Sequence, residues 1–444
     1  MNPRLVFGGT LVVAAVIQFT VPARQQAIRR SAAALLLAAS LCVAELHCAA
    51  GDGSVEYRYG GYYEDHDRIS IDTHVGAFDL SLKPWLTLKG QLVYDGISGA
   101  TPDGAPAKSQ VDPLHYPADH EVRLAHMVDE RYAGNIALTF SVGSSRITPQ
   151  YAYSEEGDYR SHGASLNYSL DLFEKNTTLN AGYSHNWDTV LPKGFLQEAA
   201  AKNSDEFIIG FNQLLGRKTA LTVNYVFGHT HGYLDDQYKG VVFVDEASQW
   251  HYDDINAAYD YLVEFHTFAE RRPASRDKHI VFAQLTQFVT SMHASVEASY
   301  RFYHDTFGVD AHTATLAWFQ KIGRNVVVAP MLRYYTQTAA SFYAVSLPGD
   351  PNLSPGAPLD FGLPNAGADG GNPNPAPPEF YSADYRLSKM ETFTYGVSIT
   401  AELSATVALV GAYERYEMKG RDGSTAAAAY PSAHIISLGA RIKF

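Results

Sequence analysis

Several segments of this 444-residue sequence alternate charged and apolar side chains, a pattern that can line a water-filled passage with charges. Across residues 293–305, Glu297 and Arg301 fall on the face opposite the apolar residues. Charges of both signs facing water either select small polar solutes through their field or pair across strands and brace the wall. We favour bracing for most of them. The expected inward-facing set is Glu56, Arg58, Lys89, Arg131, Glu156, Asp171, Glu297, Arg301, Asp305 and Arg333.

Some of these charges are candidates for solute selectivity in the lumen. Arg301 is the first to test, because Glu297 and Asp305 lie on the same face of its segment and Arg333 lies on a nearby one. If Arg301 lines a solute path, reversal of its charge should alter ion selectivity. The selectivity candidates are Glu297, Arg301, Asp305, Arg333, Glu156 and Lys89.

Two acid-rich stretches offer oxygen ligands of the kind that Ca²⁺ prefers. The first, SEEGDYRSH at residues 154–162, lacks the spacing of a calcium-binding loop, so we interpret it as a solvated, salt-bridged hairpin tip. The second lies within residues 231–277, and we interpret it as a solvated external loop. No metal site is predicted.

Motifs of the common hydrolases are missing from the sequence. It contains no G-x-S-x-G, no H-E-x-x-H and no phosphate-binding glycine loop, and its 17 histidines are scattered. An Asp/His/Ser site assembled across strands at a barrel rim would leave no local motif, so a rim-site membrane enzyme stays as an alternative. We predict neither catalytic residues nor a cofactor.

The elements that position these charges are strands. Segments of eleven to fifteen residues with apolar side chains at every second position recur along the chain, and sixteen of them form eight hairpins. They are rich in strand-forming residues, with 29 Tyr and 22 Phe in the chain. They begin near Ser54, Ile69, Trp85, Asp129, Ser144, Tyr159, Lys175, Ser204, Lys218, Lys278, His293, Val309, Arg324, Lys389, Ser404 and Ser432.

The connections between these segments alternate between short and long. Short ones lie near Lys83, Gly143, Glu174, Gly216, Thr290, Gly323 and Glu402, whereas the long ones are 96–127, 189–203, 231–277, 339–388 and 418–431. Tight periplasmic turns and extended external loops are typical of outer-membrane barrels. The Pro- and Gly-rich stretch after Phe342 is an extended external loop, a constriction folded into the mouth, or a disordered segment.

We therefore predict an all-β, transmembrane, antiparallel up-and-down β-barrel of about 16 strands, with short periplasmic turns and long external loops. No segment after residue 50 is a spanning helix, and mean hydropathy is −0.17. The apolar faces are expected to contact lipid, with aromatic residues near both interfaces. The last strand ends with Ile442 and Phe444, which we predict to be the signal for the barrel-assembly machinery.

The first 50 residues are expected to be a leader that is removed, and residues 51–444 a single barrel. The stretch from Ser31 to Ala44 is apolar and follows Arg29 and Arg30, as in a secretory signal, although the true start is open. Both cysteines lie in this leader. Without it, 30 basic and 46 acidic residues give a net charge of −16, which makes nucleic acid an unsuitable partner.

Four longer motifs resemble a known family. They are YDGISGATPDG (94–104), YSEEGDYRSHG (153–163), RYYTQTAASFY (333–343) and YSADYRLSKM (381–390). They are similar to signatures of the bacterial outer-membrane β-barrel family known as domain of unknown function 3570. The family-like positions are Asp95, Glu156, Asp158, Tyr159, Arg333, Tyr334, Tyr335, Gln337, Asp384 and Arg386. The resemblance implies no established activity. It implies at most a link to periplasmic redox traffic, through flavin-attachment and thioredoxin-like proteins.

These observations predict an integral protein of the Gram-negative outer membrane that acts as a porin-like channel or transporter for small polar solutes. Its expected partners are the lipid bilayer, the assembly machinery and the solute, and the oligomeric state is open. One alternative is a barrel scaffold for a periplasmic or surface partner, including a redox-related one. The other is the rim-site enzyme.

Overall fold

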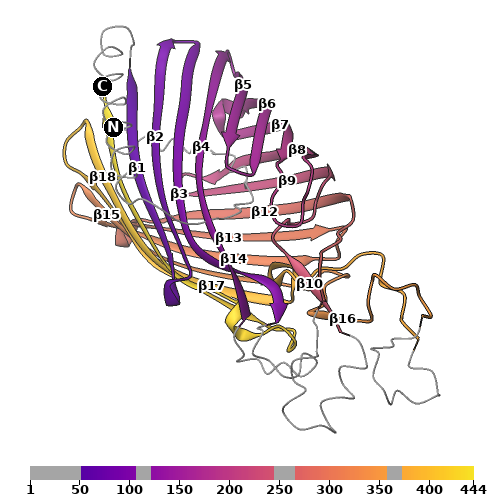
Figure 1. The fold of residues 1–444 in the computed structure, drawn as a ribbon. Coiled ribbons are helices and arrows are strands. Elements are labelled where there is room, and N and C mark those ends of the chain that lie inside the picture. Colours follow the sequence, from indigo (N-terminus) through magenta and orange to yellow (C-terminus); the bar gives the residue numbers. More distant parts are fainter. Residues whose placement is uncertain (1–51, 107–121, 245–265, 358–372) are drawn as a thin grey trace.

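Sixteen antiparallel strands close into a barrel in the computed structural model, which describes residues 52–106, 122–244, 266–357 and 373–444 (Figure 1). The predicted leader lies outside these residues. No helix among the described residues has the length and apolar character to cross a membrane. The barrel strands are β1 (Gly53–Glu64), β2 (Ile69–Lys83), β3 (Leu86–Pro106), β4 (Val122–Val142), β5 (Ser145–Glu155), β6 (Tyr159–Leu172), β7 (Thr177–Val190), β8 (Ala200–Gly216), β9 (Thr219–Gly232), β12 (Ser275–Val289), β13 (Ala294–Asp305), β14 (Asp310–Ile322), β15 (Val326–Gln337), β17 (Met390–Glu402), β18 (Val407–Gly420) and β19 (Ser432–Lys443).

Strands that follow one another along the barrel also pair in the sheet, and β19 pairs with β1 to close it. The predicted up-and-down barrel of about 16 strands is therefore confirmed. At the closure, Ser54 lies opposite Lys443, and Gly53 and Phe444 exchange backbone hydrogen bonds of 2.9 and 3.0 Å. Ile442 points outward and is exposed. The structure does not test whether Ile442 and Phe444 form a signal for the assembly machinery, so this stays a prediction.

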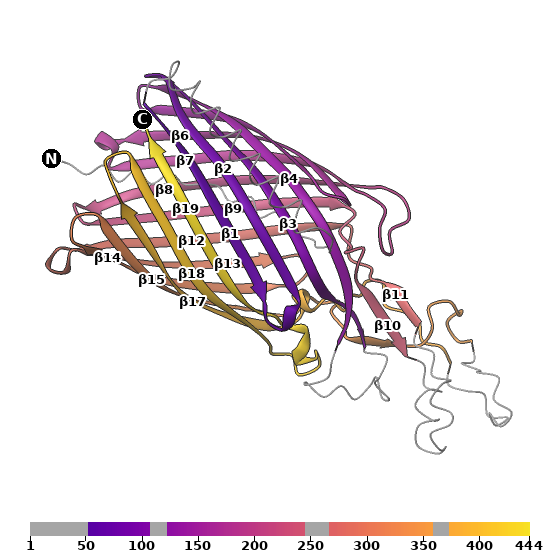
Figure 2. The ribbon, with the colours of Figure 1, turned by 60° about the vertical axis from the view of Figure 1, so that its left-hand side comes forward.

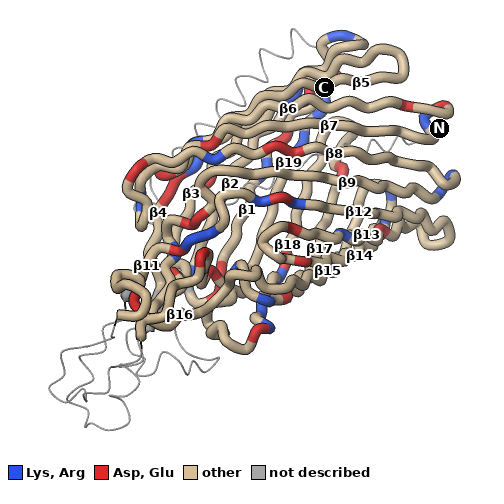
Figure 3. Tube along the Cα trace, turned by 90° about the vertical axis from the view of Figure 1, so that its right-hand side faces the viewer, with Lys and Arg blue, Asp and Glu red and all other residues tan. Residues whose placement is uncertain are grey.

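The two faces of the barrel wall have different chemistry. Large apolar side chains such as Leu92, Leu166 and Ile209 are 53–59% exposed on the outer face, as lipid contact requires. Their neighbours along each strand point inward, where ion pairs link adjacent strands. Figure 3 shows long uncharged stretches in the middle of β6 to β9, with charges gathered toward the two ends.

The two ends of the barrel differ. The first and last barrel strands begin and end at the same end of the barrel as the expected short turns, and a small three-stranded sheet lies at the other end (Figures 1 and 2). The end with the sheet also has three short connections, β1–β2, β5–β6 and β13–β14, so the predicted alternation of short and long connections holds only in part. That sheet has the order β11-β10-β16, with β10 (Gly240–Val244) antiparallel to β11 (His266–Ala269) and parallel to β16 (Ser346–Pro348). It is contributed by the connections β9–β12 and β15–β17. We call these described connections, residues 233–244, 266–274, 338–357 and 373–389, the cap.

The predicted loop 96–127 begins later than expected. Strand β3 continues to Pro106 and β4 starts at Val122, so that Pro102 pairs with Leu124 beyond the rim of the neighbouring strands. Glycine and proline at Gly99 and Pro102 interrupt the apolar alternation, which explains why this stretch resembled a loop. The central part, 107–121, lies outside the described residues.

The two faces of the wall give a direct test of lipid contact. Leu166 lies at the middle of β6 on the outer face, and Ser165 lies beside it on the inner face. We expect Leu166→Arg to destabilise the barrel in a bilayer by ~2–4 kcal/mol, because arginine at mid-depth must leave water. Ser165→Arg is the matched control and should cost far less. Urea titrations of both variants in lipid vesicles measure the difference, and equal costs would contradict an outer face in lipid.

Candidate functional site

Ion pairs along the inner wall brace neighbouring strands. Lys89 on β3 contacts Asp79 on β2 at 2.7 Å, and Arg146 on β5 contacts Asp171 on β6 at 2.6 Å. Arg131 bonds Asp95 through Nε at 2.6 Å. These charges satisfy one another within the wall, which is the bracing arrangement favoured from the sequence.

Exposure of the inner wall falls from the turn end toward the cap. The Lys89 side chain, near the turns, is 50% exposed, whereas that of Asp95, six residues nearer the cap, is 7% exposed. On β15, Arg333 is exposed and Gln337 is buried. The lumen is thus open to water at the turn end and filled at the capped end.

Arg301 and Arg333 lie on the inner face midway along the barrel, and neither forms an ion pair with any residue that the structure describes. Arg301 is opposite Thr313, and Arg333 is opposite Thr315 on the same strand, so both arginines project into one region of the lumen. The Arg301 guanidinium lies 5.9 Å from the Tyr303 ring centroid, a cation–π contact.

The other predicted partners of Arg301 have different roles. Asp305 is buried, and it accepts hydrogen bonds from Arg276 Nε at 2.9 Å and from the backbone of Phe307 at 2.9 Å. It therefore holds the β13–β14 turn. Glu297 lies opposite Thr286 and bonds its side chain.

Six buried or half-buried charges bring separate parts of the cap together. Asp384 accepts hydrogen bonds from Arg386 Nε at 2.9 Å and from Arg272 at 2.9 Å, and Arg272 contacts Glu270 at 2.7 Å. Arg386 also pairs with Asp236. With three acids and three bases the group is balanced. We call it the cap cluster, and its members are Asp236, Lys239, Glu270, Arg272, Asp384 and Arg386.

Burial and neighbouring charges shift the pKa values in this cluster in opposite directions. The pKa of Asp384 is held far below its usual range, because the adjacent Arg386, Lys239 and Arg272 outweigh the effect of burial. Burial raises the pKa of Glu270 to about 7 and lowers that of Lys239. Against the effect of burial, Arg386 and Lys239 lower the pKa of Asp236 too, so both aspartates stay ionised in the cap.

The cap contacts the barrel around its rim. Lys239 donates to the Pro102 carbonyl oxygen on β3, and its ammonium lies 5.5 Å from the Tyr385 ring centroid. On the far side, Gln337 of β15 donates to the carbonyl oxygens of Arg386 at 2.9 Å and Ser388 at 2.8 Å. These contacts attach the cap to the rim at two separate strands, β3 and β15.

Glycine is required where the cap meets β3. Gly104 has a φ of +85°, and a Cβ there would lie 2.7 Å from the carbonyl oxygen of Gly240 in β10. A larger residue would separate β10 from the end of β3. This explains why the sequence motif 94–104 ends in glycine.

The interpretation of residues 154–162 as a solvated tip is wrong for Asp158. Asp158 is 2% exposed, since Gln237 Nε2 donates to it at 2.9 Å and the Tyr238 hydroxyl also bonds it. Burial raises the pKa of the neighbouring Glu156 to about 7. Only the outward pair of Glu155 and Arg160, at 2.7 Å, matches the expected salt-bridged surface.

The solvated reading of the acid-rich loop 231–277 is also wrong for its described ends. Asp236 and Glu270 are 5% and 3% exposed and belong to the cap cluster. The sequence contained a signal that was missed, because Arg271 and Arg272 follow Glu270 directly and a basic pair inside an acidic loop can satisfy buried carboxylates. Residues 245–265 lie outside the described part.

The family-like positions gather toward the capped end. Asp158, Gln337, Asp384 and Arg386 touch the cap or belong to it, and Tyr335 packs beneath it with Tyr385. The others are more dispersed along the wall. Asp95 pairs with Arg131, Tyr159 accepts a hydrogen bond from Lys202 at 2.7 Å, Tyr334 faces outward and bonds Glu391 at 3.1 Å, Glu156 lies at the β5–β6 tip, and Arg333 lines the lumen.

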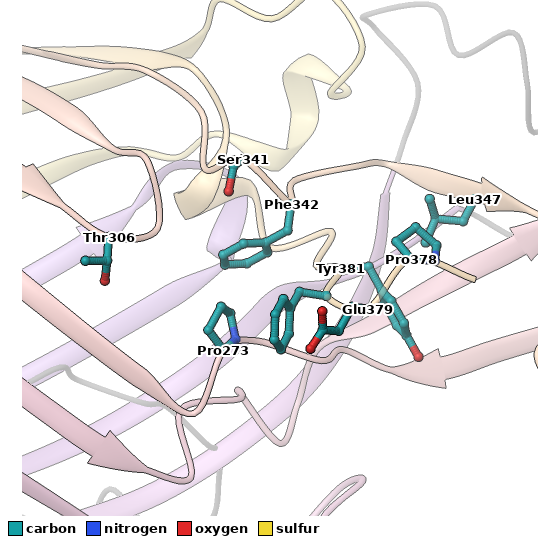
Figure 4. A pocket seen from close by; sticks show the side chains of 9 residues that line it. Pro273, Thr306, Ser341, Phe342, Leu347, Pro378, Glu379 and Tyr381 are labelled. Atoms are coloured by element: carbon teal, nitrogen blue, oxygen red, sulfur yellow. The ribbon is translucent and has the colours of Figure 1, made fainter. Parts of the chain in front are cut away.

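The cap has a pocket of its own. It has a volume of 410 Å³ and lies between the β11–β12 connection and the two ends of the β15–β17 connection (Figure 4). Figure 4 shows the ring of Phe342 near Pro273, the ring of Tyr381 toward Pro378 and Leu347, and Glu379 as the charged side chain. This pocket can accept a small, largely apolar group.

Comparisons with known proteins identify a family match and distant barrels. The family described as "Protein of unknown function (DUF3570)" matches residues 26–431. No curated protein matches the chain.

Several solved outer-membrane structures are similar at low identity. The siderophore receptors PirA from Pseudomonas aeruginosa and Acinetobacter baumannii are 10% and 13% identical, with TM-scores of 0.39 and 0.40. The matches cover 87% and 83% of this chain but only 62% and 52% of those receptors. OpdK from Pseudomonas aeruginosa, crystallised with vanillate, is 8% identical with a TM-score of 0.39, over 88% of this chain and 98% of OpdK.

Removal of one cap-cluster cation should release the cap. In Arg386→Ala, Asp384 and Asp236 lose their shared partner while buried, which costs about 3–5 kcal/mol. We expect faster protease cleavage within the cap, whereas the barrel keeps its folded gel mobility. Arg421→Ala, which removes an exposed pair with Glu391, is the control and should cleave like the wild type. Unchanged cleavage of Arg386→Ala would show that the cluster does not hold the cap.

The raised pKa of Glu270 predicts a pH effect on cap closure. In the closed cap this pKa is about 7, against an ordinary value of 4.5, so closing takes up a proton between these pH values. Stability of the closed cap from this group is therefore fully present below pH 4.5 and is lost as pH rises to 7. Protease cleavage of the wild-type cap should accelerate from pH 5 to pH 7 more than cleavage of Glu270→Gln. Equal acceleration would exclude Glu270 as the cause.

Proposed function

The chain belongs to the DUF3570 family, and we propose that it is an outer-membrane channel or transporter for small polar solutes whose external mouth is closed by a cap. The observation that carries this proposal is the lumen itself. It is charged and open to water at the turn end, holds two unpaired arginines midway, and ends beneath the cap cluster.

An outer-membrane location is supported by the outer face. Large apolar side chains cover it on every side of the barrel, for example Leu92, Ile209, Leu316 and Leu438, each more than 50% exposed. A surface of this extent is stable only in contact with hydrocarbon. The cap then faces the exterior and the short turns face the periplasm.

The lumen favours solutes that carry negative charge. Arg301 and Arg333 lack carboxylate partners among the described residues, so their charge is available to a solute that enters from the turn end. Tyr335 lies between these arginines and the cap, and its hydroxyl is within reach of the charges of both. Guanidinium groups bind carboxylate and phosphate oxygens in a bidentate manner, which suits small anions.

Transport is favoured over catalysis because of how the buried charges are used. The cap-cluster carboxylates and guanidiniums are bonded to one another, so they are not available to act on a substrate. Passage through the mouth requires the cap to move. When the cap opens, water can solvate the charged groups of the cap cluster, which offsets the loss of their ion pairs. We therefore propose a gated channel and no enzymatic activity.

Single-channel recording in planar bilayers tests this function. Arg301→Glu should shift the permeability ratio toward cations by several-fold, because it replaces an unpaired positive charge in the lumen with a negative one. Arg160→Gln changes a paired charge on the outer face and is the control with unchanged selectivity.

The closed cap requires a second arm in that experiment. Wild-type protein should conduct rarely and Arg386→Ala more often, because the cap is loosened. If neither folded protein conducts any ion, the channel function is wrong. If both conduct and Arg301→Glu keeps the wild-type selectivity, Arg301 does not line the path.

A further inference from the structure

Three carboxylates from two neighbouring parts of the rim converge beside the cap. Asp129 lies on β4, while Glu156 and Asp158 form the β5–β6 tip, and one oxygen from each lies within 4.8 Å of the others. Asp129 Oδ1 accepts backbone hydrogen bonds from Glu130 at 2.8 Å and Gly157 at 2.9 Å, which fixes the tip against β4.

Two buried oxygens at this position have no partner. Asp158 Oδ1 is buried and forms no hydrogen bond, although Oδ2 of the same carboxylate bonds both Gln237 and Tyr238. The amide oxygen of Gln237, a residue that is 1% exposed, is also without a partner. Buried polar oxygens of native proteins are almost always satisfied, so these two exceptions point to a bound partner, either an ion or an ordered water.

The nearby cations do not balance these acids. Lys193 Nζ is 3.8 Å from Asp129 Oδ2, and its charge is the only one in ion-pair contact with the three carboxylates among the described residues. Arg131, the other close cation, is bonded to Asp95 at 2.6 Å. The site therefore keeps a local excess of negative charge that a divalent ion would neutralise.

We propose that Asp129, Glu156 and Asp158, together with the amide oxygen of Gln237, bind one Ca²⁺ ion. The donors are all oxygens, three of them anionic, which is the ligand set of hard cations and disfavours zinc or copper. Gln237 belongs to the β9–β10 connection, so the ion joins the cap to the β5–β6 tip. This site is independent of the proposed transport function, because it concerns cap attachment and not the solute.

Calcium binding to the purified full-length barrel tests the site. The protein is refolded from inclusion bodies in detergent, which excludes lipopolysaccharide and its own divalent ions. Tb³⁺ should bind with sensitised emission, since the Tyr238 hydroxyl bonds Asp158, and Ca²⁺ should displace it. Isothermal titration with Ca²⁺ should give one site per chain. Absence of saturable Ca²⁺ binding to the folded wild type would overturn the proposal.

Matched variants locate the ion. Asp158→Asn and Glu156→Gln should each weaken Ca²⁺ binding by at least ~10-fold, the effect of losing even an outer-shell partner of a metal. Asp79→Asn removes an inner-wall carboxylate that pairs with Lys89, far from the cap, and should bind like the wild type. Equal loss in Asp79→Asn, or no loss in Asp158→Asn, would place the ion elsewhere and refute this site.

A variant in the cap tests the same site without a change in the barrel wall, so its result does not depend on whether the wall variants fold. Gln237→Glu lies in a loop outside the barrel wall, so the barrel should still fold. It replaces the Nε2 donor to Asp158 with a fourth carboxylate, and it should bind Ca²⁺ more tightly because the ion then neutralises both acids. Ca²⁺ should also slow protease cleavage of the wild-type cap and leave Asp158→Asn unaffected. Weaker binding by folded Gln237→Glu, or cleavage that Ca²⁺ does not change in the wild type, would contradict the link between ion and cap.

Discussion

The whole structure depends on closure of the backbone hydrogen-bond ladder between β1 and β19. In hydrocarbon no water satisfies a free N–H or C=O, so an open sheet edge is unstable there and the sixteen strands must form a ring. Once the ring is closed, the pleat sends alternate side chains to opposite sides. Lipid outside then admits only apolar residues such as Leu166 and Ile209, and every charge is confined to the lumen or the two ends.

The lumen charges in turn had to be balanced within the wall. Most are, through pairs between adjacent strands such as Lys89 with Asp79 at 2.7 Å and Arg146 with Asp171 at 2.6 Å. Such pairs also fix the register of the strands, because a shift of one residue would turn each paired side chain to the opposite face of the sheet. Arg301 and Arg333 form no such pair with any described residue. Their charges are therefore available to a solute.

The barrel could be predicted from the sequence because its determinants are local. Alternation of apolar side chains and short turns such as that at Gly143 gave the strand number, and most strand starts lie within a few residues of those expected. Two features escaped prediction for physical reasons. Gly99 and Pro102 hide the continuation of β3 past the rim, since neither residue continues an apolar pattern. The cap cluster joins Asp236 to Arg386, 150 residues away, and no periodicity reports such a contact.

The cap is held by small apolar clusters and by buried ion pairs, and the ion pairs have consequences for gating. A buried ion pair contributes little net stability, because both groups lose water when it forms and regain water when it breaks. The pairs of Asp384 with Arg272 and Arg386 can therefore fix the position of the cap while they add little to the free energy of opening it. A metal at the β5–β6 tip would add an anchor whose strength follows the external ion concentration, because binding to the closed state alone stabilises it by mass action. Two anchors of this kind, one set by charge balance and one by a ligand, allow the barrel to remain rigid while its mouth responds to its surroundings.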